Sequence, residues 1–95
     1  MKKVAVLIKD VDQQYEGLRL SLGALLDDVD IQMVVLKHEI ANMDEAYHDN
    51  MEFLDEMEGQ RISNNMENAE KYGFQHETIK EIAQRLRAVD LVIPF

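Results

Sequence analysis

Cysteine is absent from this chain of 95 residues, and its absence excludes several classes of function. Without a thiol there are no disulfides, no cysteine-ligated metal sites and no thiolate nucleophile among the protein's own side chains. A disulfide-stabilised secreted scaffold is therefore excluded, because proteins of that class are built on paired cysteines.

Long hydrophobic runs are also missing. Near the amino terminus, five consecutive apolar residues, Val4 to Ile8, precede Lys9 and Asp10, and this run is too short for the core of a signal peptide. No stretch approaches the ~20 apolar residues of a membrane span. We therefore expect a cytoplasmic protein with no membrane partner.

Basic residues are few, since ten Lys and Arg stand against nineteen Asp and Glu and leave a net charge of −9. Nucleic acids and anionic membranes are bound through clustered Lys and Arg, so neither is an expected partner. The acids are unevenly placed, with eight between His38 and Gln60 and no Lys or Arg among them. Two interpretations stay open: a solvated acidic helix face, or a docking surface for a basic partner.

Apolar patterning predicts strands and helices in a single domain that spans residues 1–95. Residues 3–8 and 31–36 are continuous apolar runs, which are typical of strands buried on both faces. Residues 61–64 form a weaker strand, and residues 90–95 form the closing one. Because Pro94 has no amide hydrogen, we expect the pairing of the closing strand to fade there.

Helical periodicity covers four other segments, at about residues 13–28, 41–58, 66–72 and 77–89. Asp12 is the expected N-cap of the first helix, and Gly59 and Gly73 are the expected ends of the second and third. Gly17 and Gly23 are expected to let the first helix pack closely on the sheet. The apolar stripes expected to face the core are Tyr15, Leu18, Leu22, Leu25 and Leu26; Met43, Tyr47, Met51, Leu54 and Met57; and Ile79, Ile82, Ala83 and Leu86.

The order of these elements predicts an α/β fold, a three-layer α/β/α sandwich around a small, mostly parallel sheet of about four strands. A right-handed crossover is expected between the first two strands. A small sheet with incompletely covered edges or faces often completes itself by association. We therefore expect a homo-oligomer.

In an open parallel sheet, ligands bind beyond the carboxyl ends of the strands. The candidate ligand-binding residues at this rim are Asp10, Gln13, His38, Asn64, Asn65 and Asn68. No glycine-rich phosphate loop follows the first strand, so no nucleotide or flavin cofactor is expected. Ser21 and Ser63 lie outside any Gly-x-Ser-x-Gly elbow, and no histidine has a partnered nucleophile, so no catalytic set is predicted.

Histidine and carboxylate side chains offer one candidate cluster for a metal. Asp44, His48 and Glu52 are spaced by four residues and so share one face of the second helix. A zinc or iron site needs further ligands from elsewhere, and no HExxH pattern supplies them. Surface ion pairing is the preferred interpretation of this cluster, and no metal site is assigned.

Five segments together resemble the DsrE/DsrF/TusD-like family of small sulfur-relay proteins. They are residues 2–10 (KKVAVLIKD), 15–28 (YEGLRLSLGALLDD), 31–36, 65–74 (NMENAEKYGF) and 89–95 (VDLVIPF). The resemblance implies a DsrE/F-like sandwich of flavodoxin-like topology that forms homo- or hetero-oligomers. It also implies a persulfide-carrying cysteine in the loop after the third strand, where this chain has Asn65 or Asn68.

An asparagine amide cannot carry a persulfide, because sulfur transfer needs a thiolate. The first hypothesis is therefore a non-catalytic binding or assembly module, not itself a persulfide carrier, that associates with copies of itself or with paralogous DsrE/F-like subunits. The second is a small-ligand-binding protein or enzyme that uses the rim. The third is a weak divalent metal binder that uses the cluster on the second helix.

Overall fold

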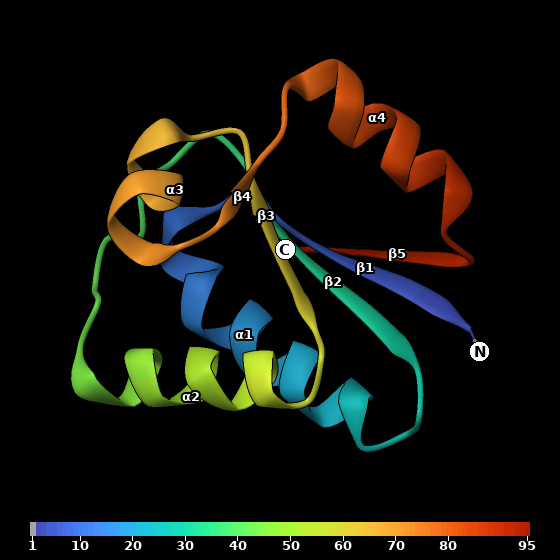
Figure 1. The fold of residues 1–95 in the computed structure, drawn as a ribbon, viewed down its shortest axis with the longest axis horizontal. Helices are drawn as coiled ribbons and strands as arrows, with labels where there is room; N and C mark the ends of the chain where they lie inside the picture. Colours follow the sequence, from blue (N-terminus) through green and yellow to red (C-terminus); the bar gives the residue numbers. More distant parts are fainter. Residues whose placement is uncertain (1) are drawn as a thin grey trace.

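Five parallel strands form the centre of the described structure, a computed structural model that covers residues 2–95 (Figure 1). The strands are β1 (Lys3–Ile8), β2 (Asp30–Val35), β3 (Gln60–Ser63), β4 (Gln75–His76) and β5 (Leu91–Pro94). Their order across the sheet is β4-β3-β2-β1-β5. The prediction of about four strands was one short, because β4 has two polar residues and no pattern that the sequence could show.

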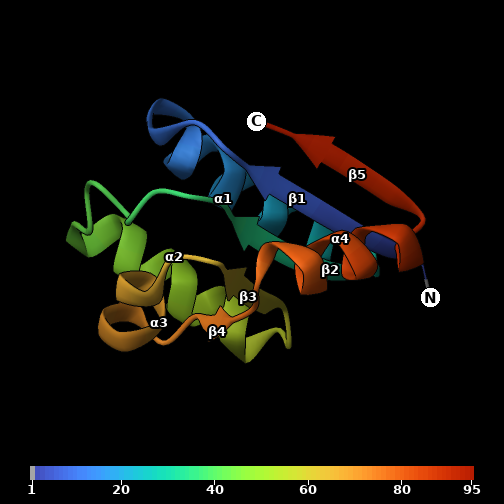
Figure 2. The same ribbon diagram turned by 90° about the horizontal axis from the view of Figure 1, so that it is seen from above.

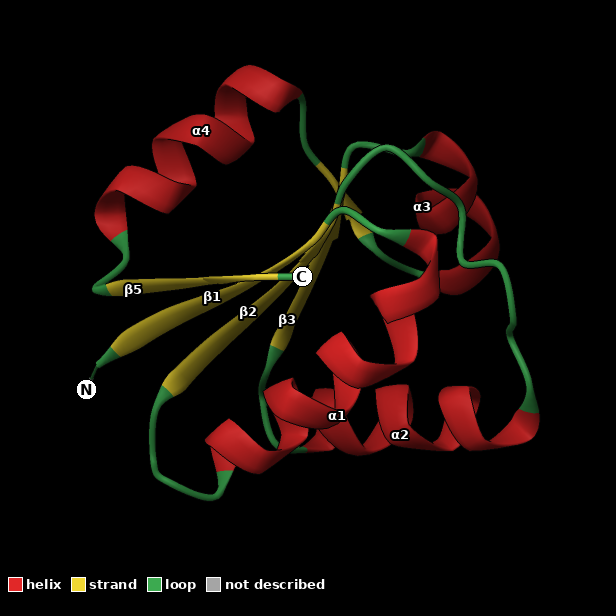
Figure 3. Ribbon diagram, turned by 180° about the vertical axis from the view of Figure 1, so that it is seen from behind, coloured by secondary structure: helices red, strands yellow, loops and turns green. Residues whose placement is uncertain are grey.

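Helices cover the two faces of the sheet unequally. The helices are α1 (Gln14–Leu25), α2 (Glu45–Glu56), α3 (Met66–Tyr72) and α4 (Ile79–Ala88), and a short 3₁₀ turn, η1 (Val11–Gln13), precedes α1. Helices α1 and α2 lie side by side on one face, whereas α4 lies on the other (Figures 1 and 3). The predicted α/β class and the three-layer arrangement are confirmed.

The strand order corrects one detail of the predicted topology. Flavodoxin-like sheets have the order 2-1-3-4-5, whereas the chain here steps from β1 to β4 in one direction and then returns to place β5 beside β1. Right-handed crossovers in one direction put their helices on one face, and a crossover in the opposite direction puts its helix on the other. This rule explains why α4 lies alone.

The two faces of the sheet bury cores of different size. Alternate residues of β1 and β2, such as Val6 and Met33, join α1 and α2 in a core of twelve buried side chains. On the α4 face the buried core consists of Val34, Ile62 and Ile82, with partly buried leucines around it. The α4 face of the sheet is therefore thinly covered.

Helix α1 buries only part of its predicted stripe: Leu18 is buried, and Leu22 and Leu25 pack partly against the core. Its buried positions are Gln14, Gly17, Leu18 and Ser21, whereas Tyr15 and Leu26, expected in the core, are 42% and 74% exposed. A Cβ on Gly17 would come within 2.5 Å of Ile8 Cγ1. The helix thus approaches β1 through its glycine, and this contact sets its rotation.

The two glycines of α1 give a matched test of this close approach. We expect Gly17→Ala to lower the free energy of unfolding by about 1–2 kcal/mol, because the new methyl must displace the buried Ile8. Gly23 has no atom within 4 Å of an added Cβ, so Gly23→Ala should raise the free energy of unfolding by about 0.5–1 kcal/mol. Urea unfolding of both variants measures the difference, and equal effects would contradict the assigned packing.

Several helix ends differ from the sequence prediction because capping side chains define them. Helix α2 begins at Glu45 instead of residue 41, where Asp44 accepts a hydrogen bond from the Tyr47 amide. It ends before Glu58, which takes a φ of 65° in place of the expected Gly59. Asp10, not Asp12, caps the turn that leads into α1. Gly73 ends α3 with a φ of 74°, as predicted.

The closing strand keeps its pairing beyond Pro94, so the predicted fading was wrong. The Phe95 amide donates to the Leu7 carbonyl at 2.8 Å, and the Lys9 amide donates to the Phe95 carbonyl at 3.0 Å. Strand β5 is the outer neighbour of β1. Proline is tolerated on an edge strand because its missing amide hydrogen lies on the unpaired side.

Candidate functional site

The carboxyl ends of the parallel strands lie together at one rim of the sheet, as the arrowheads of β1, β2 and β5 show in Figure 2. The segments that follow β1, β2 and β3 meet there and carry the predicted candidate residues. The side chains of three of the six candidates, the asparagines, bond to the loop after β2, residues 37–41.

Asn68 is the most buried of the candidates, with 0% of its surface exposed. Its Oδ1 accepts a hydrogen bond from the Ile40 amide at 2.9 Å. Its Nδ2 donates to the His38 carbonyl at 3.0 Å and to Ser63 Oγ at 3.1 Å. Both ends of this amide are therefore committed to other groups of the protein.

Asn64 and Asn65 bind the start of the same loop, at Lys37. Asn64 Oδ1 accepts from the Lys37 amide at 2.7 Å, and Asn65 Nδ2 donates to the Lys37 carbonyl at 3.1 Å. Lys37 has a φ of 74°, a left-handed conformation that is strained for a residue with a side chain. The two asparagines thus fix the backbone on both sides of that strained residue.

Two further polar side chains of the rim were not among the predicted candidate residues. Gln14, buried in α1, accepts from the Ala41 amide at 2.9 Å and donates to the Glu39 carbonyl at 3.1 Å. Ser63 Oγ donates to the Val35 carbonyl at 2.7 Å and accepts from the Asn65 amide at 3.0 Å. The sequence offered only their positions as a signal, because Gln14 lies in the first turn of a predicted helix and Ser63 lies near the end of a predicted strand.

We call Gln14, Ser63, Asn64, Asn65 and Asn68 the rim latch. Their side chains join η1–α1 and the β3–α3 turn to the loop of residues 37–41. Within residues 2–95, no buried side-chain nitrogen or oxygen is left without a partner. The latch is therefore a satisfied internal network, and a ligand would compete with the loop backbone for its atoms.

Two of the remaining candidates border an open hollow of about 570 Å³ where the strand order reverses between β1 and β5. Asp10 and His38 line it, together with Lys9, Asp12, Val11 and Phe95. Gln13 and the three asparagines are not among its lining residues. The carboxylate of Asp10 accepts from the Asp12 amide at 3.0 Å, so it also caps η1.

A second cavity of about 320 Å³ lies between the first turns of α1 and α2. Its lining residues are Val11, Asp12, Gln14, Tyr15, Ala41, Asn42, Asp44, Ala46 and Tyr47. The Tyr47 hydroxyl lies 3.5 Å from the Gln14 carbonyl, to which it donates, and its burial raises the pKa of the phenol above its usual value. Tyr47 therefore stays protonated and acts as a donor, not as a base.

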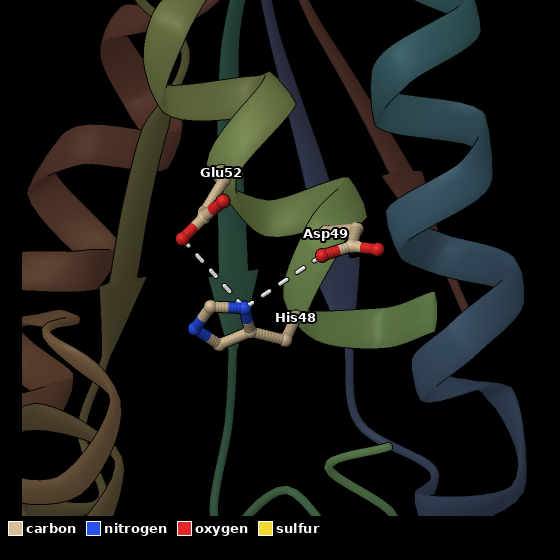
Figure 4. Close-up of side chains that lie close together, drawn as sticks. All are labelled: His48, Asp49 and Glu52. Carbon is tan, nitrogen blue, oxygen red and sulfur yellow. Dashed lines mark ion pairs between the residues drawn. The ribbon is translucent and has the colours of Figure 1, made fainter. Parts of the chain in front are cut away.

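The structure changes the membership of the predicted metal cluster. His48 Nδ1 lies 3.7 Å from Glu52 and 4.0 Å from Asp49 (Figure 4). Asp44 is not in this group, because its carboxylate caps α2. The group draws on one exposed stretch of helix, so the interpretation as surface ion pairing fits the geometry.

A buried ion pair under α4 also escaped the sequence prediction. Arg85 pairs with Glu77, and its Nη1 donates to Gln32 and Gln60, each at 3.0 Å. Glu77 is 7% exposed. The hydrogen bond to Glu77 raises the pKa of the Arg85 guanidinium above its usual value. These contacts tie α4 to β2 and β3.

Comparison of the chain with models of protein families, with characterised proteins and with solved structures finds no match. The resemblance to sulfur-relay proteins therefore stays a prediction. None of the helices within residues 2–95 combines the length and apolar character that crossing a bilayer requires.

Proposed function

We propose that this protein is a non-catalytic α/β assembly module whose copies associate through the thinly covered α4 face of the sheet. The observation that carries the proposal is the small apolar core on that face, a cluster of three buried hydrophobic side chains against a cluster of twelve on the other. Apolar surface left open at such a place is stabilised by burial against a partner.

The surface in question comprises Leu7, Leu36, Ile79 and Pro94, which we call the α4-side patch. Leu7 and Pro94 are paired neighbours on β1 and β5, and Leu36 directly follows β2 on the same face as Val34. Ile79 shares the inward stripe of α4 with Ile82 and Leu86, yet it is 58% exposed. The apolar stripe of α4 is therefore packed on the sheet at Ile82 and Leu86, but is open to solvent at its first residue, Ile79.

The rim latch supports the non-catalytic part of the proposal. Asn65 caps α3 by accepting from the Glu67 and Asn68 amides, and Asn68 is fully buried. These are the two positions at which the resemblance would place a reactive cysteine, and both hold a structural amide. We propose that the chain keeps a DsrE/F-like scaffold in the cytoplasm, without sulfur transfer, and assembles with itself or with paralogous subunits.

The expected result in solution is a particle whose mass is a multiple of 11.0 kDa, measured by light scattering after size exclusion. Ile79→Glu should shift the particle toward the monomer, because a charge would have to be buried in the contact. Leu26→Glu is the matched control, since Leu26 is exposed on a helix of the opposite face. A monomeric parent chain, or equal behaviour of the two variants, would overturn the proposal.

The hollow at the reversal of strand order favours one alternative, a small-ligand-binding protein. Ligands of open parallel sheets bind at that position, and Lys9, Asp10 and His38 line it here. A ligand that binds the folded state raises the melting temperature. A thermal-shift screen of flavins, nucleotides and divalent metals separates this alternative from the assembly module, and its metal arm also tests weak binding at the cluster of His48.

A further inference from the structure

The outer surface between α1 and α2 carries two apolar rows. Tyr15, Leu22 and the C-cap residue Leu26 follow one another along α1 at intervals of seven and four residues. Ala46, Phe53 and the C-cap residue Met57 do the same along α2. We call these six residues the α1–α2 seam. Phe53, Met57 and Leu26 are 45%, 42% and 74% exposed, whereas Leu22 is partly buried against the core.

The two rows face each other across one groove. Tyr15 and Ala46, the first members of each row, both line the 320 Å³ cavity between the helix starts. Asp55, on the other flank of α2, pairs with Arg61 of β3, so the flank that carries Phe53 and Met57 is turned toward α1. The two helices pack against each other on this face of the sheet, where Figure 3 shows them together.

An acidic row borders the groove on its α2 side. Glu45, Asp49, Glu52 and Glu56 recur at intervals of four, three and four residues, which places them on one face of the helix, and all four are exposed. His48 contacts two of them. Helix α2 itself carries no Lys or Arg, and the basic residues near the row, Arg61 and Lys71, border the hollow beside Glu52 on the flank away from α1.

A second copy of this chain is a poor occupant of the seam. If it bound through the same surface, it would bring its own acidic row to the contact, opposite the first. Like charges placed opposite each other across an interface cost about several kcal/mol of binding free energy, which disfavours a partner of the same charge. Charge complementarity therefore selects a basic partner.

We propose that the α1–α2 seam binds a basic amphipathic helix of a partner protein. Its apolar side chains, spaced by three, four and seven residues, lie in the groove against Tyr15, Phe53 and Met57. Its Lys and Arg side chains lie against the acidic row of α2. The seam is on the opposite face of the sheet from the α4-side patch, so this inference does not depend on self-assembly.

The probe is a fluorescein-labelled peptide of about 18 residues, with leucines on one helical face and lysines on the other. Binding is measured by fluorescence anisotropy at low and moderate salt. We expect saturable binding that weakens with salt, because charge pairs near the surface are screened. A scrambled peptide of the same composition should bind about tenfold more weakly or not at all, since it presents no apolar face.

Two pairs of matched variants locate the site. Phe53→Gln with Met57→Gln should weaken binding about tenfold or more, whereas Leu20→Gln with Leu91→Gln, at exposed apolar positions outside the seam, should not. Glu52→Gln with Glu56→Gln should weaken binding and its salt dependence. The control for charge is Glu67→Gln with Glu70→Gln on α3, which removes the same number of charges elsewhere.

Each outcome decides the inference. Loss of binding confined to the seam and α2 variants supports it. Equal loss in the α2 and α3 double variants would show that binding follows net charge alone and would overturn it. Absence of saturable binding by the parent chain, or an unchanged affinity after substitution of Phe53 and Met57, would also overturn it.

Discussion

Replacement of Asn68 by alanine should lower the free energy of unfolding by about 3 kcal/mol, which for a domain of this size is a fall of about 15 °C in Tm. The side chain is fully buried and makes hydrogen bonds to Ile40, His38 and Ser63. Its loss leaves the buried Ile40 amide without an acceptor. An unpaired buried donor costs more than an average hydrogen bond contributes.

Urea unfolding of the variant measures the loss, and hydrogen exchange locates it. The Ile40 amide should exchange faster in Asn68→Ala, because its acceptor is Asn68 Oδ1. Asn64→Ala is the matched control, since its single bond is to the amide of the exposed Lys37, and it should cost about 1 kcal/mol or less. If both substitutions cost the same, the latch would not depend on the buried amide.

Replacement of Arg85 by methionine should destabilise the fold by about 3 kcal/mol. The change removes the cationic partner of the Glu77 carboxylate, which is 7% exposed and keeps only the neutral donor Gln75. It also removes the donor to Gln32 and Gln60. A buried charge that loses its partner costs more than the intact pair contributes. Because these bonds tie α4 to the sheet, the loss should be largest in that helix.

A double-mutant cycle with Glu77→Leu checks this prediction. The double variant Glu77→Leu with Arg85→Met should recover much of the lost stability, because it removes both charges and leaves an apolar pair. Arg87→Met, an exposed arginine of the same helix, should change the free energy of unfolding by about 0.5 kcal/mol or less. An Arg85→Met variant as stable as Arg87→Met would show that the pair does not hold α4 in place.

The elements that the sequence predicted best are those with a short-range signal. Strands β1 and β2 are dense apolar runs, and α3 lies between an N-cap asparagine and a C-terminal glycine, so both patterns act within a few residues. Even the weak strand β3 was predicted within one residue. The rotation of α1 was not, because it depends on the contact of Gly17 with β1.

The sequence was enough to locate the rim of the sheet, but not to predict which groups the rim side chains would bond. Asn68 bonds back to Ile40 and His38, and Asn64 to Lys37, across 27 to 30 residues of the chain. Amide side chains both donate and accept, so their residue type fits a ligand site and a loop latch equally well. The partner that each one finds depends on how β2 and β3 pair.

By itself the sequence determined the α/β class, the alternation of strands and helices, and the exclusion of thiol chemistry. These depend on composition and on periodicities of two and 3.6 residues, about the range over which neighbouring side chains share a face. The tertiary structure alone decided the strand order, the isolation of α4 and the pairing of Arg85 with Gln32. It also decided that the asparagines at the predicted cysteine position bind the backbone. Such contacts join residues distant in the chain, and the sheet brings them together only after it has formed.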